Sequence, residues 1–149
     1  MPVQWRPAMA IDQAVIDDDH RYLIDMINSL ESLCGGEFDQ AVLLKQLDAL
    51  KYYTVYHFVR EEAAQRAANY PDADDHALEH KRLVETVDQL IALVSQDITP
   101  DKHERIRQKI SALLKGWLVE HIIKHDIPMR PYVRNIRAFM GRSAPLSTV

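Results

Sequence analysis

The sequence predicts an all-α protein, an antiparallel up-down-up-down four-helix bundle with an N-terminal arm. Four segments repeat inward-facing residues at alternating steps of three and four, which is the period of one helix face. The connections between them are a few residues long, which favours antiparallel neighbours. Only 4 of the 149 residues are Gly, and helix-forming residues are abundant. We expect a single domain over residues 1–149, with the arm over about residues 1–10 and a loose tail over about residues 141–149.

The first predicted helix covers about residues 11–34 and ends at Gly35–Gly36. Its inward-facing positions, which we call its seam, are Ile16, His20, Leu23, Ile27, Leu30 and Cys34. Free cysteines are usually buried, so we interpret Cys34 as a buried structural thiol. Three consecutive acidic residues are expected to favour the start of this helix through its dipole. They are Asp17, Asp18 and Asp19.

Three further helices follow from the same spacing. The second covers about residues 39–69, and its seam is Leu43, Leu47, Leu50, Thr54, His57, Glu61, Ala64 and Ala68. The third covers about residues 74–95, and its seam is His76, His80, Leu83, Val87, Leu90 and Val94. The fourth begins after Thr99–Pro100, and its seam is Ile110, Leu114, Trp117 and His121. It should weaken near Pro128 and Pro131, because proline lacks the backbone N–H of a helix interior.

The composition argues against nucleic acid and membranes as partners. The net charge is −4 at pH 7 and the basic residues are scattered, so no basic patch is available to neutralise phosphates. No apolar run approaches the roughly 20 residues that span a bilayer. The N-terminal residues lack the apolar region of a secretory signal, and the single cysteine cannot form an internal disulfide. We therefore expect a cytoplasmic protein.

Polar residues interrupt the seams of all four helices at a similar depth. Measured from the interhelical turns, with a rise of about 1.5 Å per residue, the seam histidines agree in height within roughly one and a half turns. A lone buried histidine would be explained by a hydrogen bond to a carbonyl group. Five histidines and a glutamate in one apolar layer would each cost a few kcal/mol if left unpaired. A bound cation accounts for the whole set.

The spacing within two helices supports this metal site. His57 and Glu61 form an HxxxE pair and His76 and His80 form an HxxxH pair, so each pair lies on one helix face within reach of a shared metal. Imidazole and carboxylate without thiolate favour iron, zinc or manganese. Six or more ligands exceed the set of one structural zinc, so two metals bridged by carboxylate fit better. The ferritin-like di-iron pattern is disfavoured, because the sequence contains no Glu-x-x-His.

Four sequence elements resemble the hemerythrin family, and bacteriohemerythrins in particular. The matching elements are IDDDHRYL around His20, HFVREE from His57 to Glu62, HALEHKRL from His76 to Leu83 and WLVEHIIKHD from Trp117 to Asp126. Together with Trp5 they span nearly the whole chain in the family's order. The resemblance implies a four-helix bundle that holds two iron ions with a bridging oxo or hydroxo group. The implied ligands are His76, His80 and His121 on one iron, His20 and His57 on the other, and Glu61 and Asp126 as bridges.

The resemblance also implies a function. The iron held by two histidines would keep one open coordination position, where O2 would bind reversibly. Storage or transport of O2 is the first hypothesis, and under this hypothesis the protein would not be an enzyme. An O2 or redox sensor that signals to a protein partner is the alternative, and a di-iron enzyme that reduces O2, peroxide or nitric oxide ranks last. Four apolar residues near the ligands are candidates for the O2 pocket, although each is equally explained as ordinary core. They are Leu118, Ile24, Phe58 and Ile122.

The last ligand is not settled by spacing. On a straight helix His125 points within about 40° of His121, whereas Asp126 lies about 140° away. The family motif places the carboxylate at Asp126, which requires a widened or distorted turn before Pro128. We follow the motif, and we expect His125 to lie on the outer face or to support a ligand. His103 is expected to be exposed and without a role.

Overall fold

The computed structural model describes residues 2–134, and this part of the chain contains helices and no strand. Four long helices run over Val15–Cys34 (α1), Gln40–Ala67 (α2), Ala73–Val94 (α3) and His103–His121 (α4). Short 3-10 turns lie at Pro7–Met9 and Pro100–Lys102. After α4 come a π-helical turn at Ile122–Asp126, a 3-10 turn at Ile127–Met129 and one further helical stretch over 130–134.

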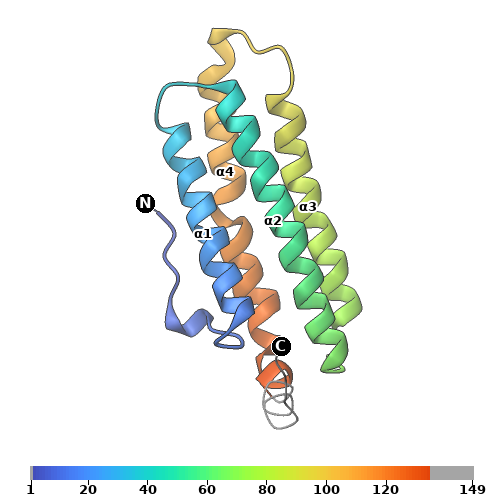
Figure 1. Cartoon of the computed structure of the whole chain (residues 1–149). Coiled ribbons are helices and arrows are strands. Elements are labelled where there is room, and N and C mark those ends of the chain that lie inside the picture. The colour runs from blue at the N-terminus through green and yellow to red at the C-terminus, as the bar shows by residue number, and fades with distance from the viewer. Residues whose placement is uncertain (1, 135–149) are drawn as a thin grey trace, which may run out of the picture.

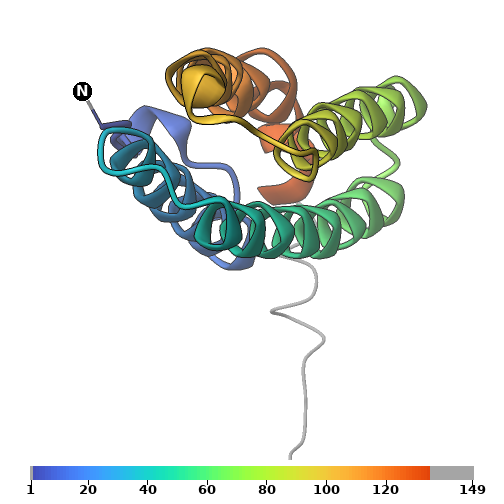
Figure 2. The same cartoon turned by 90° about the horizontal axis from the view of Figure 1, so that it is seen from above.

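The four helices alternate in direction around a common axis (Figure 1). The α1/α2 and α3/α4 connections lie at one end of the bundle, and the α2/α3 connection lies at the other. Seen along the axis, α1 and α3 each pack against both α2 and α4 (Figure 2). The predicted all-α class and up-down-up-down arrangement are therefore confirmed.

The apolar core is divided into two clusters. The larger one fills the bundle toward the α1/α2 and α3/α4 connections, and it includes the fully buried Leu47, Leu50 and Leu114. The smaller one lies near the opposite end and consists of Ile11, Ile16, Tyr70, Met129 and Val133. Among residues 2–134, twelve polar or charged residues are also buried, and the histidines among them belong to the layer predicted from the seams. A polar layer therefore separates two apolar regions.

The start of α1 differs from the prediction. The helix begins at Val15 rather than near residue 11, because Gln13 adopts a positive φ of 54° and interrupts the helical path. The Asp12 carboxylate accepts hydrogen bonds from the backbone N–H of Ala14 and Ile16, so it satisfies donors that the helix start leaves free. The Asp17 carboxylate accepts from the N–H of Ile11 and Gln13 and ties the preceding loop to α1. Asp17 thus has a specific structural role beyond the helix dipole.

Two side chains outside the polar layer also differ from expectation. Cys34 is half-buried rather than buried, and burial raises the pKa of its thiol to about 11, so the thiol stays protonated at neutral pH. His103 is half-buried rather than exposed, because its ring stacks on Phe38 at 4.0 Å between centroids. The fourth helix does lose its regular form before Pro128, as predicted, whereas Pro131 is the second residue of the last helical stretch, within the first turn where proline is tolerated. The tail expected over residues 141–149 lies outside the described residues.

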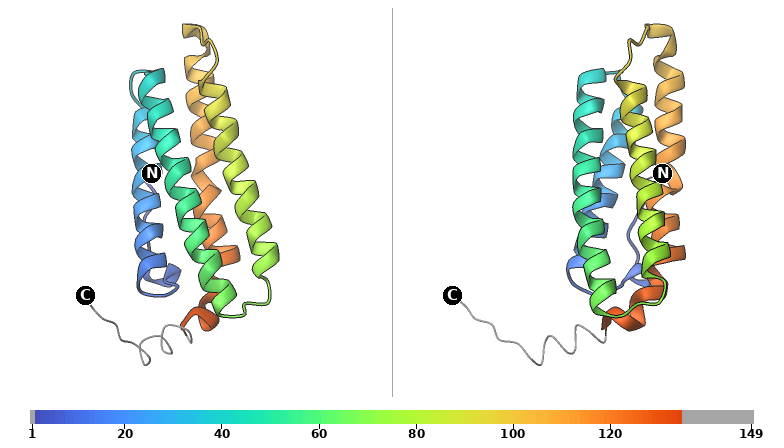
Figure 3. Two further views of the ribbon diagram at one scale, coloured as in Figure 1. Left: turned by 45° about the vertical axis from the view of Figure 1, so that its right-hand side comes forward. Right: turned by 90° about the vertical axis from the view of Figure 1, so that its right-hand side faces the viewer.

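The N-terminal arm lies against the bundle, as predicted. Figures 1 and 3 show residues 2–14 descending beside the bundle before α1 begins. The backbone N–H and carbonyl of Val3 both pair with the Asn28 side-chain amide, each at 2.8 Å. The Trp5 ring lies under the Arg21 guanidinium at 4.0 Å. Among the described helices, none is both long and apolar enough to cross a membrane.

We expect Asn28→Ala to release the arm from α1. The substitution removes two hydrogen bonds to Val3, each of which contributes about 0.5–1.5 kcal/mol. Urea denaturation should show a lower free energy of unfolding, and limited proteolysis should cut the arm faster. Asp25→Ala, at an exposed position on the same helix, is the control. Equal stability and equal proteolysis for the two variants would contradict this account of the arm.

Candidate metal centre

The seven side chains predicted as ligands meet in one buried layer of the bundle. None of them is more than 3% exposed. They come from all four helices and from the π-helical turn, and they are His20 on α1, His57 and Glu61 on α2, His76 and His80 on α3, His121 on α4 and Asp126 at the end of the turn. Candidate ligand atoms of these residues form two overlapping groups, in each of which all atoms lie within 4.8 Å of one another.

Three histidines surround one side of the two carboxylates. Glu61 Oε1 lies 2.9 Å from His76 Nε2 and 3.1 Å from His80 Nε2. Asp126 Oδ1 lies 2.9 Å from His76 Nε2 and 2.9 Å from His121 Nε2. We call these three histidines with the two oxygens the three-histidine set.

Two histidines surround the other side of the same carboxylates. Glu61 Oε2 lies 3.2 Å from His57 Nε2 and 3.5 Å from His20 Nε2. Asp126 Oδ2 lies 3.2 Å from His20 Nε2, and the two Nε2 atoms lie 3.1 Å apart. We call this the two-histidine set. Glu61 therefore presents one oxygen to both histidines of this set, whereas Asp126 reaches the set through His20.

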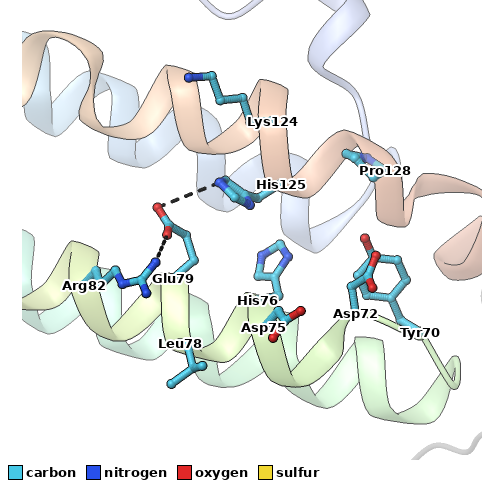
Figure 4. A pocket seen from close by; sticks show the side chains of 10 residues that line it. All are labelled: Tyr70, Asp72, Asp75, His76, Leu78, Glu79, Arg82, Lys124, His125 and Pro128. Carbon is cyan, nitrogen blue, oxygen red and sulfur yellow. Dashed lines mark hydrogen bonds and ion pairs between the residues drawn. The ribbon is translucent and has the colours of Figure 1, made fainter.

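The π-helical turn brings Asp126 into this layer. A π-helical turn holds more residues than an α-helical turn, so Asp126, five residues after His121, is carried round to the inward position. Asp126 is fully buried, whereas the His125 side chain is 40% exposed. His125 Nε2 points toward Glu79 Oε1 at 3.9 Å, across a surface cleft of about 440 Å³ that also borders His76 (Figure 4). The structure thus places His125 on the outer face, as one of the two expected alternatives.

The separations between these atoms suit metal binding. Two ligand atoms at adjacent corners of an octahedron, each about 2.1 Å from the ion, lie about 3 Å apart. The N···O distances above run from 2.9 to 3.5 Å. His121 Nε2 and both Asp126 oxygens are buried and have no hydrogen-bond partner. Their short distances to neighbouring ligand atoms therefore do not have the geometry of hydrogen bonds. Lone pairs that converge on a shared cation, rather than on each other, explain these orphaned atoms.

Comparison with known proteins decides the family. A family model described as the hemerythrin HHE cation-binding domain matches residues 12–129. The chain belongs to the hemerythrin family. It is 33% identical over 113 residues to a bacteriohemerythrin of Methylococcus capsulatus, covering 74% of this chain and 79% of that protein. It is 28% identical over 121 residues to a myohemerythrin of Theromyzon tessulatum, covering 81% of this chain and 85% of that protein.

Solved structures agree with this assignment. A crystal structure of wild-type hemerythrin superimposes with a TM-score of 0.72 at 26% identity, over 90% of this chain and 99% of the other. The hemerythrin-type bundle predicted from the seams and motifs is therefore confirmed at the level of fold and family. The buried histidine and carboxylate cluster is the part of this hemerythrin suited to hold metal.

In each set, one histidine has a carboxylate next to its Nδ1 atom, on the side of the ring away from the cluster. The sequence did not predict this supporting role for either carboxylate. Asp19 Oδ2 lies 3.0 Å from His57 Nδ1, and the other oxygen of Asp19 accepts from Tyr53 and Arg60. On the opposite side Glu62 Oε1 lies 2.9 Å from His80 Nδ1. A carboxylate on Nδ1 fixes the tautomer that leaves the Nε2 lone pair free for a metal.

The sequence offered only weak signals for these two supporting residues. Asp19 stands in a run of three aspartates, which predicted an effect on the start of α1. It is instead buried and turned toward α2. Glu62 is the second glutamate of HFVREE, and its contact with α3 depends on how α2 and α3 pack. Both roles come from the tertiary arrangement.

The electrostatics of the metal-free layer are dominated by the two carboxylates. Burial alone would raise the pKa of Glu61 and Asp126, but the surrounding histidines hold both values well below the ordinary range. Burial likewise opposes the charged form of His20, yet Asp126 and Glu61 outweigh it and raise the pKa of His20 to about 10. The same carboxylates raise the pKa of His76 to about 9. Protons on histidines therefore neutralise the carboxylates until a metal replaces them.

We expect metal loading at pH 7 to release at least two protons per chain, because His20 and His76 are protonated below their raised pKa values and must be neutral to bind metal, and the pKa of His57 is raised as well. Released protons should fall toward zero as the pH rises through 9 to 10. In the metal-free protein, the stabilisation from these two charged histidines is fully present below about pH 6.5 and is lost over the same rise. Titration with Zn²⁺ in buffers of different ionisation enthalpy measures the release. No proton release at pH 7 would show that both histidines are already neutral.

We expect Asp19→Ala to weaken metal binding by about 10- to 100-fold, because His57 loses the carboxylate that orients its ring. Competition with a chelator gives the affinity. Asp18→Ala is the matched control, since Asp18 precedes Asp19 directly, is 74% exposed and pairs with Arg21 on the surface. A similar loss in both variants would indicate a general effect on α1 rather than support of His57.

Proposed function

We propose that this hemerythrin binds O2 reversibly at a non-haem di-iron centre and serves in O2 storage or transport. In this proposal the three-histidine set holds one iron and the two-histidine set holds the other. Glu61 and Asp126 bridge the two ions, together with an oxo or hydroxo group. The relatives named bacteriohemerythrin, myohemerythrin and hemerythrin support the assignment of this family's chemistry to the cluster.

The unequal number of histidines in the two sets is the observation that carries the proposal. Glu61 belongs to both sets and Asp126 Oδ2 also approaches His20 at 3.2 Å, but one set has three imidazole nitrogens and the other has two. An octahedral ion in the two-histidine set therefore has one ligand fewer from the protein. That difference leaves room for a small molecule at one ion and not at the other.

The surroundings of the cluster favour binding over further reaction. Iron(II), when bound, supplies the electrons that O2 requires. The chain contributes a dry enclosure, since the four pocket candidates Leu118, Ile24, Phe58 and Ile122 are at most 3% exposed and belong to the main core cluster. The Phe58 ring stacks on His80 at 3.7 Å and lies 5.6 Å from His57. Exclusion of water limits the protons that would convert bound O2 to released products.

A sensor role is the second candidate, and one contact supports it. Arg130 follows the π-helical turn and its guanidinium donates to the carbonyl oxygens of Ala8 and Ala10 at 2.7 Å. Arg130 is four residues after Asp126, so a displacement of Asp126 would be transmitted along the backbone to Arg130 and from there to the N-terminal arm. A di-iron enzyme that reduces O2, peroxide or nitric oxide has less support, because none of the four pocket candidates carries an acidic group.

Anaerobic loading with iron(II) followed by cycles of O2 and argon tests the proposal. We expect about two irons per chain and an O2-dependent visible absorption band that appears and disappears over repeated cycles. Asp126→Ala should lower the iron content, whereas His125→Ala, at the partly exposed neighbouring position, should leave it unchanged. Irreversible oxidation in the first cycle would refute the carrier role, and loss of iron in His125→Ala alone would refute the assignment of Asp126.

A further inference from the structure

Thr54 is a fully buried residue on α2 whose hydroxyl has no hydrogen-bond partner in the structure. A buried polar group without a partner costs about 1–3 kcal/mol, so its presence calls for an explanation. Thr54 lies three residues before His57, and residues at this spacing share one face of a helix. The hydroxyl therefore belongs to the face of α2 that carries the metal cluster.

Thr54 shares a layer of the bundle with two of the pocket candidates. Ile24 follows His20 by four residues on α1, and Leu118 precedes His121 by three on α4. Figure 1 shows that α1 runs opposite to α2 and α4. By the helical rise, all three positions therefore lie about one turn from the cluster, toward the α1/α2 connection. Ile24 and Leu118 are apolar and at most 3% exposed, so Thr54 brings the polar group into this layer.

Thr54 lies on α2, one of the two helices that supply the two-histidine set. α1 and α2 supply both histidines of that set, whose Nε2 atoms lie 3.1 Å apart. Thr54 stands one helical turn from His57, whereas the three-histidine set takes its histidines from α3 and α4. Thr54 thus stands on one of the two helices that supply the set with one histidine fewer.

We propose that the Thr54 hydroxyl donates a hydrogen bond to the small ligand that occupies the open position of the two-histidine set. This inference rests on the proposed di-iron centre, and the ligand would be O2 in the proposed function or a small anion such as azide. The donor suits reversible binding. An aliphatic hydroxyl can donate a hydrogen bond while keeping its proton, so it can hold the ligand without protonating it.

A threonine within a helix has another common partner, the carbonyl oxygen one turn earlier. Thr86 on α3 shows this arrangement, since its hydroxyl donates to the Arg82 carbonyl at 3.2 Å. Thr54 makes no such bond. Thr86, a partly buried threonine whose hydroxyl has a partner, therefore serves as a control for substitutions of Thr54.

The decisive test compares Thr54→Val, which keeps the shape and removes the hydroxyl, with Thr54→Ser, which keeps the hydroxyl. In the oxidised iron-loaded protein, Thr54→Val should weaken azide binding about tenfold and Thr54→Ser should restore it, because one hydrogen bond is lost and regained. The infrared azide stretch should shift when wild-type protein is moved from H2O to D2O. That shift should vanish in Thr54→Val and persist in Thr86→Val.

A second readout needs no iron. In the metal-free protein the hydroxyl remains unpartnered, so Thr54→Val should raise the melting temperature by about 2–4 °C, whereas Thr86→Val should not.

Unchanged azide affinity in Thr54→Val overturns the proposal. So does a loss that Thr54→Ser fails to restore, since packing and not the hydroxyl would then be responsible. A hydroxyl effect on azide in a protein that never binds O2 reversibly would refute the proposed function and leave the role of Thr54 standing.

Discussion

The structure depends on the placement of two carboxylates, Glu61 and Asp126, at the centre of an otherwise apolar bundle. Both are fully buried, and each lies within about hydrogen-bond distance of histidines on both sides. A buried carboxylate is tolerated only when positive charge is close to it. All four helices must therefore bring an imidazole to one height, which sets their register along the bundle axis. The two apolar clusters above and below this layer then exclude water from it.

This constraint also explains the irregular end of α4. A continuous α-helix would carry His125 inward and Asp126 outward, which would remove one of the two carboxylates from the layer. The π-helical turn adds about one residue to the turn, so Asp126 faces inward and His125 faces outward. Pro128 assists, because it cannot donate the backbone hydrogen bond that would continue a regular helix. A local departure from regular structure is thus retained where the metal layer requires it, as is common for π-turns at functional sites.

The sequence predicted the parts of the centre that follow from local period, and it missed those that depend on packing. The seams placed His20, His57, His80 and His121 at one height, because a helix has a fixed rise and period. Helical spacing alone favoured His125 over Asp126 as the last ligand, and only the family motif indicated Asp126. Residue propensities do not predict where a π-helical turn will form. The support of His57 by Asp19 and of His80 by Glu62 connects different helices. Such contacts depend on helix rotation and separation, which a single sequence does not specify.

The two halves of the bundle hold their histidines in different ways. Asp19 and Glu62 fix His57 on α2 and His80 on α3, whereas the Nδ1 atoms of His20 on α1 and His121 on α4 are buried without partners. Orientation of the latter two rings therefore depends on the packing of α1 and α4. These are also the helices to which the arm is attached, through Asn28 on α1 and Arg130 beyond α4. The two rings that no Nδ1 hydrogen bond fixes therefore lie on the helices that carry the two contacts of the arm, so a change in the orientation of these rings would act first on α1 and α4.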